Sequence, residues 1–165
     1  MRGLARREAV LPRELPLIVH AEPEPIARSA VEIMTGAGFT VLGHLEGGLS
    51  AWKRDGQPTE TLPVLDVDEL HSTLGDYVVI DARERFEHGH AHISGAVLVP
   101  PGDAWERASK LPAGQPLAVV CGDQTRSAYV ASILARKGLE TVLVLGGMVD
   151  WLERGYPVEK HAARS

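Results

Sequence analysis

Val119-Val120-Cys121-Gly122-Asp123-Gln124-Thr125-Arg126-Ser127 contains the only cysteine of this 165-residue chain. Before it, the apolar run from Leu117 to Val120 predicts a buried strand of a parallel sheet. After it, apolar residues at helical spacing predict a helix that ends at Gly138. The stretch therefore places a thiol where a strand meets a helix. The free N–H groups of a helix start stabilise thiolates and bound anions, and Arg126 adds a positive charge there.

A lone cysteine behind two valines is also typical of an inert core thiol, so neighbouring motifs must decide between the two interpretations. The helix is followed by Leu145-Gly146-Gly147-Met148-Val149-Asp150-Trp151. Loop, helix and this turn together resemble the active-site loop and C-terminal half of a rhodanese domain. Upstream, Ile80-Asp81-Ala82-Arg83 is similar to the family's Asp-x-Arg strand end, and His92-Ile93-Ser94-Gly95-Ala96 to its Gly-His-Ile-x-Gly-Ala turn, with Ala91 in place of glycine.

Short apolar runs alternate with helical patterns through the second part of the chain. They predict about five strands near residues 64–65, 77–80, 97–99, 117–120 and 142–145. Such alternation is typical of α/β proteins with a mostly parallel sheet. The resemblance implies the rhodanese-like three-layer fold, with a roughly five-stranded, mostly parallel sheet flanked by helices. Sites in such folds form beyond the carboxyl ends of the strands, where Asp81 and Cys121 are expected.

The chain also contains an internal repeat with an offset of about one hundred residues. Pro16 to Ala21 aligns with Pro116 to Cys121. After a one-residue slip, Gly47, Gly48 and Trp52 match Gly146, Gly147 and Trp151. We therefore interpret residues 1–60 as the C-terminal half of a first rhodanese-like unit, and residues 61–165 as a complete rhodanese domain.

The first unit is expected to be catalytically silent. Ala21 stands at the position of the cysteine, and Glu22-Pro23-Glu24-Pro25 brings carboxylates and prolines where an anion cradle needs backbone N–H donors. Half of an α/β unit leaves apolar sheet surface and a sheet edge uncovered. We therefore expect residues 1–60 to pack on the complete domain, on upstream residues, or on a second copy in a homodimer, whereas residues 62–165 should fold alone.

The resemblance implies a sulfurtransferase whose catalytic nucleophile is Cys121. It would take a sulfane sulfur from thiosulfate, a persulfide or 3-mercaptopyruvate, hold it as a persulfide, and pass it to a thiol or a cyanide-like acceptor without a cofactor. The expected anion cradle and substrate-binding residues are Gly122, Asp123, Gln124, Thr125, Arg126, Ser127 and Arg83. The expected structural supports are Asp81, Glu87 and His92, with a tight turn at Gly146 and Gly147.

Two of these assignments leave alternatives open. Asp123 is unexpected in an anion site, because its carboxylate would repel a thiolate or dianionic thiosulfate. We therefore expect thiosulfate to be a poor donor, unless Asp123 pairs with Arg126 and orders the loop. Arg83 could bind substrate, but it could equally form a buried ion pair with Asp81 at the strand end.

The histidines of His88-Gly89-His90-Ala91-His92 suggest a metal site at first sight. No cysteine or carboxylate completes a familiar ligand pattern around them. We therefore expect no metal, a structural role for His92, and solvent-facing positions for His88 and His90.

Two other functions share parts of the cysteine pattern. Cysteine phosphatases also cradle an oxyanion between a cysteine and an arginine, but their spacing is Cys-x5-Arg, whereas Cys121 to Arg126 is Cys-x4-Arg. The resemblance implies that the shorter loop suits a terminal sulfur better than a phosphoryl group. The second alternative is a non-catalytic regulatory module that binds a protein partner, and Asp123 in the cradle favours it.

Charge and composition limit the classes of binding partner and the cellular compartment that we expect. A net charge of −5 without a dense basic stretch argues against nucleic acid, and no apolar run is as long as a membrane span. Pro12 and its charged neighbours interrupt any apolar leader, so no signal peptide is expected. A single cysteine excludes an internal disulfide and suits a reducing compartment, which predicts a cytoplasmic protein.

Overall fold

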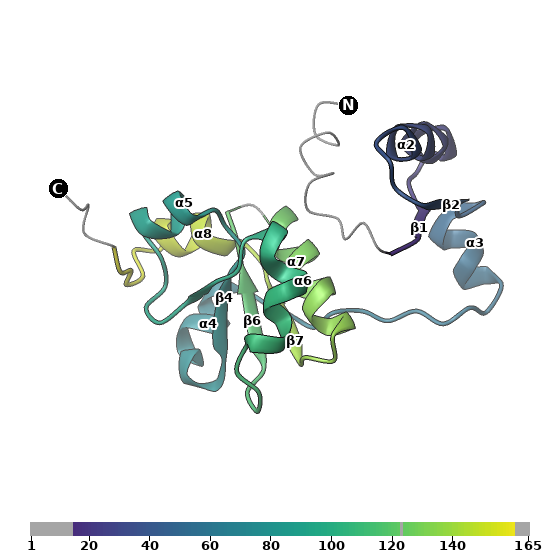
Figure 1. The fold of residues 1–165 in the computed structure, drawn as a ribbon. Helices are drawn as coiled ribbons and strands as arrows, with labels where there is room; N and C mark the ends of the chain where they lie inside the picture. The colour runs from purple at the N-terminus through teal and green to yellow at the C-terminus, as the bar shows by residue number, and fades with distance from the viewer. Residues whose placement is uncertain (1–14, 123, 161–165) are drawn as a thin grey trace. The chain divides into compact units, whose positions relative to one another are not determined.

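The computed structural model describes residues 15–122 and 124–160, and the chain forms two compact units, Met1–Thr61 and Leu62–Ser165 (Figure 1). The second unit is built on a five-stranded sheet. Its strands are β3 (Val64–Leu65), β4 (Val78–Asp81), β5 (Val97–Leu98), β6 (Leu117–Val120) and β7 (Thr141–Val144), in the spatial order β3-β7-β6-β4-β5. Every pairing is parallel. The predicted α/β fold is therefore confirmed, with a sheet that is parallel throughout.

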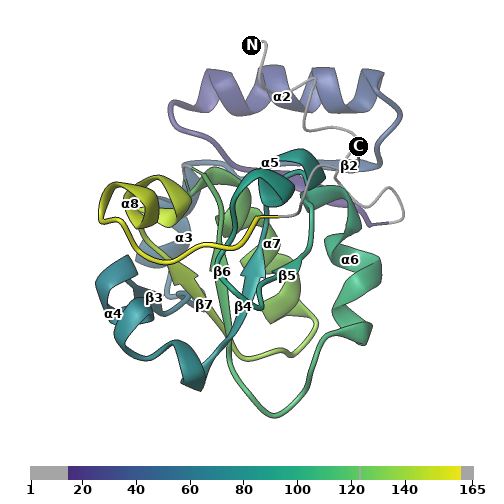
Figure 2. The same cartoon turned by 90° about the vertical axis from the view of Figure 1, so that its left-hand side faces the viewer.

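Helices cover both faces of this sheet (Figure 2). The helices are α4 (Val67–Ser72), α5 (Arg85–His90), α6 (Ala104–Arg107), α7 (Thr125–Arg136) and α8 (Gly147–Glu153), joined in places by the short 3-10 turns η2 (Leu74–Asp76), η3 (Pro101–Asp103) and η4 (Ala108–Lys110). Side chains of α6 and α7 form one apolar cluster with the sheet, and side chains of α4 and α8 form another on the opposite face. The result is the expected three-layer arrangement.

The central strand β6 shows how the sequence produces this layering. All four of its residues are buried, as expected for a parallel strand that is covered on both faces. Leu117 and Val119 pack on the α6–α7 side, whereas Ala118 and Val120 pack on the α4–α8 side. Cys121 continues the alternation and belongs to the α6–α7 cluster.

The register of the sheet brings two predicted site residues together. Asp81 of β4 lies opposite Val120 of β6, and the N–H of Ala82 donates to the Val120 carbonyl at 2.8 Å. Asp81 and Cys121 are therefore at neighbouring carboxyl ends of adjacent strands, as predicted.

The first unit repeats the order of β6, α7, β7 and α8. It contains β1 (Leu17–Val19), α2 (Glu24–Gly36), β2 (Val41–His44) and α3 (Gly48–Arg54), with β1 and β2 parallel. Residues that the internal repeat aligns make equivalent hydrogen bonds. Trp52 Nε1 donates to the Pro58 carbonyl at 2.9 Å, and Trp151 Nε1 donates to the Pro157 carbonyl at 2.9 Å. These parallels support the interpretation of residues 1–60 as half of a rhodanese-like unit, which stays a prediction.

One face of the β1–β2 sheet is exposed. Ile18 and Leu42 are 64% and 67% exposed, whereas the matched Ala118 and Val142 of the second unit are buried. In the second unit this face is covered by α4, which contributes Val67 and Leu70 to the cluster. The described residues of the first unit contain no helix equivalent to α4.

Residues 62–165 produced alone should unfold in a single cooperative transition. Both apolar clusters of the second unit draw all their members from residues 62–158, so removal of the first unit takes nothing out of this core. Thermal unfolding followed by far-UV circular dichroism measures the transition. Residues 1–61 alone are the control and should show none, because residues 15–61, the part of this unit that the structure describes, form a sheet of two strands with an exposed apolar face. Aggregation or gradual melting of residues 62–165 would contradict the expectation.

Candidate active site

Cys121 is fully buried and directly follows β6. Its thiol donates a hydrogen bond to Ser127 Oγ at 3.2 Å, and Ser127 Oγ donates to the Gln124 carbonyl at 3.0 Å. Ser127 lies in the first turn of α7 and is itself buried. The thiol is therefore tied to the start of the helix, and the strand, thiol and helix follow one another in the predicted order.

Gln124 shapes the loop between the thiol and α7. It precedes the helix with φ 75° and ψ −22°, and it is the only described residue other than glycine with a positive φ. This left-handed conformation costs an L-residue roughly 1–2 kcal/mol, and such strain is typical of functional loops. Asp123 lies outside the described residues, so the expectations for its carboxylate stay predictions.

The turn at Gly146 and Gly147 docks on the backbone of Cys121. Gly147 has φ 57°, and a Cβ added to it would lie 2.3 Å from the Cys121 carbonyl oxygen. The N–H of Met148 donates to that oxygen at 2.7 Å. Glycine is therefore required at position 147 for both conformation and space, and the expected tight turn beside the loop is confirmed.

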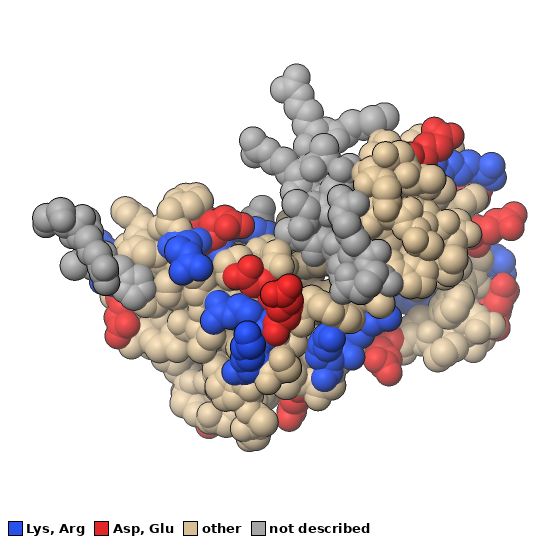
Figure 3. All heavy atoms as spheres, viewed as in Figure 1, with Lys and Arg blue, Asp and Glu red and all other residues tan. Residues whose placement is uncertain are grey.

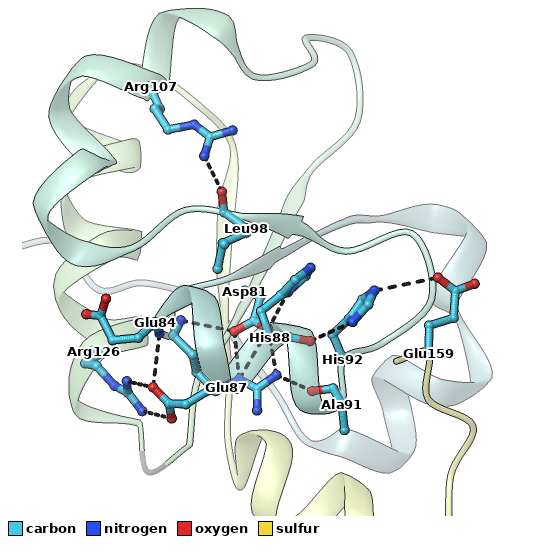
Figure 4. A network of polar contacts seen from close by, with 11 residues as sticks. Asp81, Glu84, Glu87, His88, Ala91, His92, Leu98, Arg107, Arg126 and Glu159 are labelled. Atoms are coloured by element: carbon cyan, nitrogen blue, oxygen red, sulfur yellow. Dashed lines mark hydrogen bonds and ion pairs between the residues drawn. The ribbon is translucent and has the colours of Figure 1, made fainter. Parts of the chain in front are cut away.

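Arg126, in the first turn of α7, pairs with Glu87 of α5 (Figure 4). Its Nη1 lies 2.5 Å from Glu87 Oε2, and its Nη2 lies 2.8 Å from Oε1. Glu87 Oε2 also accepts the Glu84 N–H at 3.0 Å, which holds the carboxylate in place. Chiefly through these bonds, Arg126 lowers the pKa of Glu87 below its ordinary value. The geometry favours the loop-supporting role expected for Glu87.

Asp81 is the centre of a buried polar network at the end of β4 (Figure 4). Its Oδ1 accepts from Arg83 Nε at 2.9 Å, and its Oδ2 accepts from Arg83 Nη2 at 2.7 Å and from His88 Nδ1 at 2.9 Å. Arg83 Nη2 also donates to the Ala91 carbonyl at 2.6 Å. Because Arg83 is only 6% exposed and tightly paired, the geometry favours its role as a buried ion-pair partner over substrate binding.

The expectation that His88 faces solvent is wrong. His88 is 7% exposed, and its ring stacks on that of His92 with centroids 3.9 Å apart. The physical reason is α5, because a helix in place of the expected loop turns His88 towards Asp81. His90 is exposed as expected, and His92 is buried, with Nδ1 donating to the His88 carbonyl at 2.8 Å.

Charged side chains of both signs are interspersed over the visible face of the described residues (Figure 3). Within residues 15–122 and 124–160, no group of three or more His, Cys, Asp or Glu side chains is arranged to hold a metal ion. No helix in the same part of the chain has the length and apolar character needed to cross a membrane.

Asp81→Asn should lower the free energy of unfolding by about 3–5 kcal/mol, because it leaves the guanidinium of Arg83 buried without its counter-charge. Urea unfolding of the full chain measures the loss. Glu153→Gln removes the same charge from an exposed position of α8 and should change stability by less than about 0.5 kcal/mol. If both variants lose equally little stability, the buried Asp81–Arg83 pair does not stabilise the site.

Comparisons with known proteins agree with this geometry. The family model for the rhodanese-like domain matches residues 66–154. A rhodanese-related protein from Thermoplasma volcanium superposes with a TM-score of 0.57 at 32% identity, over 59% of this chain and 97% of that one. A thiosulfate sulfurtransferase from Pseudomonas aeruginosa covers 96% of this chain with 35% of its own length, at 23% identity and a TM-score of 0.55, which shows the fold alone.

Two curated relatives carry names related to sulfur transfer. A candidate sulfur carrier protein of Bacillus subtilis is 34% identical over 74 residues, which are 44% of this chain and 40% of that protein. A tRNA sulfurtransferase of Thermoplasma acidophilum is 39% identical over 91 residues, 48% of this chain and 18% of that protein. This chain therefore spans less than half the length of either relative. Because the family model covers more than half of the chain and its fold agrees, the protein belongs to the rhodanese-like domain family.

Proposed function

We propose that this protein is a sulfurtransferase that carries a sulfane sulfur as a persulfide on Cys121. The observation that carries the proposal is the place of the single cysteine, at the end of the central strand with its thiol bonded to the first turn of α7. Relatives named for sulfur carriage and sulfur transfer support the same class of reaction.

The reaction is a nucleophilic transfer of one sulfur atom. The Cys121 thiolate attacks the outer sulfur of the donor, and a sulfur–sulfur bond to Cys121 forms as the bond between that sulfur and the rest of the donor breaks. The electron pair of the broken bond leaves with the donor. A thiol or a cyanide-like acceptor then attacks the outer sulfur of the persulfide and restores Cys121.

Groups around Cys121 can stabilise each charged state. The Ser127 hydroxyl accepts from the thiol at rest, and it can rotate to donate to the thiolate, because a hydroxyl is both donor and acceptor. The loop leads directly into α7, and the free N–H groups of a helix start favour negative charge on the carried sulfur.

Arg126 contributes charge and loop order together. A Cβ at Gly122 would lie 3.2 Å from Arg126 Nη2, so the guanidinium rests against the first residue after the nucleophile. Because Glu87 holds the same guanidinium, the loop carries an ion pair there instead of a lone cation. Arg126 therefore positions the cradle, while Glu87 offsets much of the charge that Arg126 offers to an anion there.

Incubation with a competent donor should add the mass of one sulfur atom to the protein, and a thiol reductant should remove it. Cys121→Ser should add none, whereas Ser132→Ala, on the exposed side of α7, should behave as wild type. Intact-mass spectrometry after treatment with thiosulfate, an organic persulfide and 3-mercaptopyruvate measures the change. A wild-type protein that stays unmodified by every donor and binds a protein partner would identify a regulatory module. Cys121-dependent hydrolysis of aryl phosphates would identify a phosphatase.

Glu87→Gln should lower stability in a pH-dependent way. Because Arg126 lowers the pKa of Glu87 in the folded protein, the ionised pair stabilises the fold above the ordinary glutamate pKa, and this contribution is lost as the pH falls through the lowered folded-state value. At neutral pH we expect a loss of about 1 kcal/mol for this partly exposed pair, together with a lower rate of persulfide formation. Urea unfolding at neutral and at strongly acidic pH measures the difference. An equal loss at both would show that shape, and not charge, is what Glu87 contributes.

A further inference from the structure

A pocket of about 440 Å³ opens beside the candidate active-site loop, within the size range of small-molecule sites. Gly122 and Gln124 of the loop form one side of it. The other sides come from Asp66 at the start of α4 and from residues in and around α8, including Leu145, Val149 and Arg154. None of these α4 and α8 residues belongs to the cradle that the sequence predicts.

The elements that line the pocket contact the backbone of Cys121. Gly122 directly follows Cys121, and α8 is bonded to the Cys121 carbonyl through the N–H of Met148. The Cys121 side chain is buried and does not line the pocket. The pocket is therefore placed to hold the body of a substrate beside the backbone of Cys121, whose thiol lies on the α7 side.

Acidic side chains dominate the charge of the pocket. Asp66 and Asp150 line it together with one cation, Arg154. Arg154 is itself compensated, since its Nε lies 2.6 Å from Asp68 Oδ1 and its Nη1 lies 3.5 Å from Asp150 Oδ2. A hydrogen bond from Tyr156, with Arg154 nearby, lowers the pKa of Asp68, so that this carboxylate stays charged. The two lining carboxylates outnumber the one lining guanidinium, which Asp68 also pairs, and the pocket favours a positively charged group.

Apolar side chains also line the pocket. Leu145 and Val149 are 39% and 52% exposed, although both are aliphatic, and they offer surface to a short carbon chain. Arg126, in the first turn of α7, is held by Glu87, and Arg83 is held by Asp81. A dianionic donor would therefore meet cations that carboxylates have already neutralised.

We propose that this pocket binds the body of an organic persulfide that carries an ammonium group close to its sulfur. The proposal rests on the sulfurtransferase function proposed above and names its donor class. Asp66 and Asp150 hold the ammonium group, and Leu145 and Val149 contact the carbon chain. Cys121 forms a bond to the outer sulfur as the donor's sulfur–sulfur bond breaks, and the electron pair leaves on the donor as a thiolate. The step needs no external oxidant or reductant.

Three matched donors test the proposal: the persulfides of cysteamine, 2-mercaptoethanol and mercaptoacetate, whose organic parts are cationic, neutral and anionic. Their intrinsic reactivities differ, so the decisive quantity is how a pocket variant changes kcat/KM for each donor separately. Asp66→Asn removes a charge but keeps a good helix N-cap. Asp150→Asn removes the second charge, and Glu153→Gln is the control, an exposed residue of α8 outside the pocket.

Each aspartate variant should lower kcat/KM for cysteamine persulfide about three- to five-fold, because a charge at the pocket mouth acts over a few ångströms through partly screened solvent. The kcat/KM for 2-mercaptoethanol persulfide should stay unchanged, and that for mercaptoacetate persulfide should rise. Added salt should reduce these changes, and Glu153→Gln should show none. Equal effects on all three donors would overturn the pocket proposal while leaving sulfur transfer intact. Absence of any Cys121 persulfide with every donor would instead overturn the proposed function itself.

Discussion

The carbonyl oxygen of Cys121 is the point on which the arrangement of this site depends. The N–H of Met148 binds it at 2.7 Å, and only a glycine at position 147 leaves room for that approach. This one contact joins the central strand to α8. It thereby fixes the distance between Cys121 and the acidic pocket, because Gly146, Val149 and Asp150 all follow the position of α8.

A second constraint acts from the other side of the loop. Helix α5 supplies Glu87 to Arg126 and His88 to Asp81, so that the same short helix contacts the start of α7 and the buried network at the end of β4. The loop is thus held between α5 and α8. This clamping explains how Gln124 can keep a disfavoured left-handed backbone, since neighbouring contacts must offset its cost.

Sequence patterns predicted the parts of this site that depend on local chemistry. The apolar alternation of β6, the cysteine at its end and the glycine pair before α8 each have a physical signature within a few residues, and the structure contains all three. The position of His88 was not predictable in this way. Its burial depends on a short helix whose charged and histidine-rich sequence reads as a loop, and on Asp81 seven residues earlier in the chain. The acidic pocket was missed as well, because Asp66 and Asp150 are far apart in sequence and meet only through the packing of α4 and α8.

The first unit contains a glycine turn equivalent to the one that contacts the Cys121 carbonyl. Gly48 matches Gly147 and also has a positive φ, of 62°. A Cβ at Gly48 would lie 3.1 Å from Glu22 Oε1 and 3.1 Å from His20 Cε1, so side chains approach this glycine where the Cys121 carbonyl approaches Gly147. Glu22 stands at the position of Gly122, and its carboxylate is one of the two side chains that approach Gly48. The glycine turn can therefore serve the packing of strand and helix whatever residues follow the strand, whereas the chemistry of a site depends on those residues.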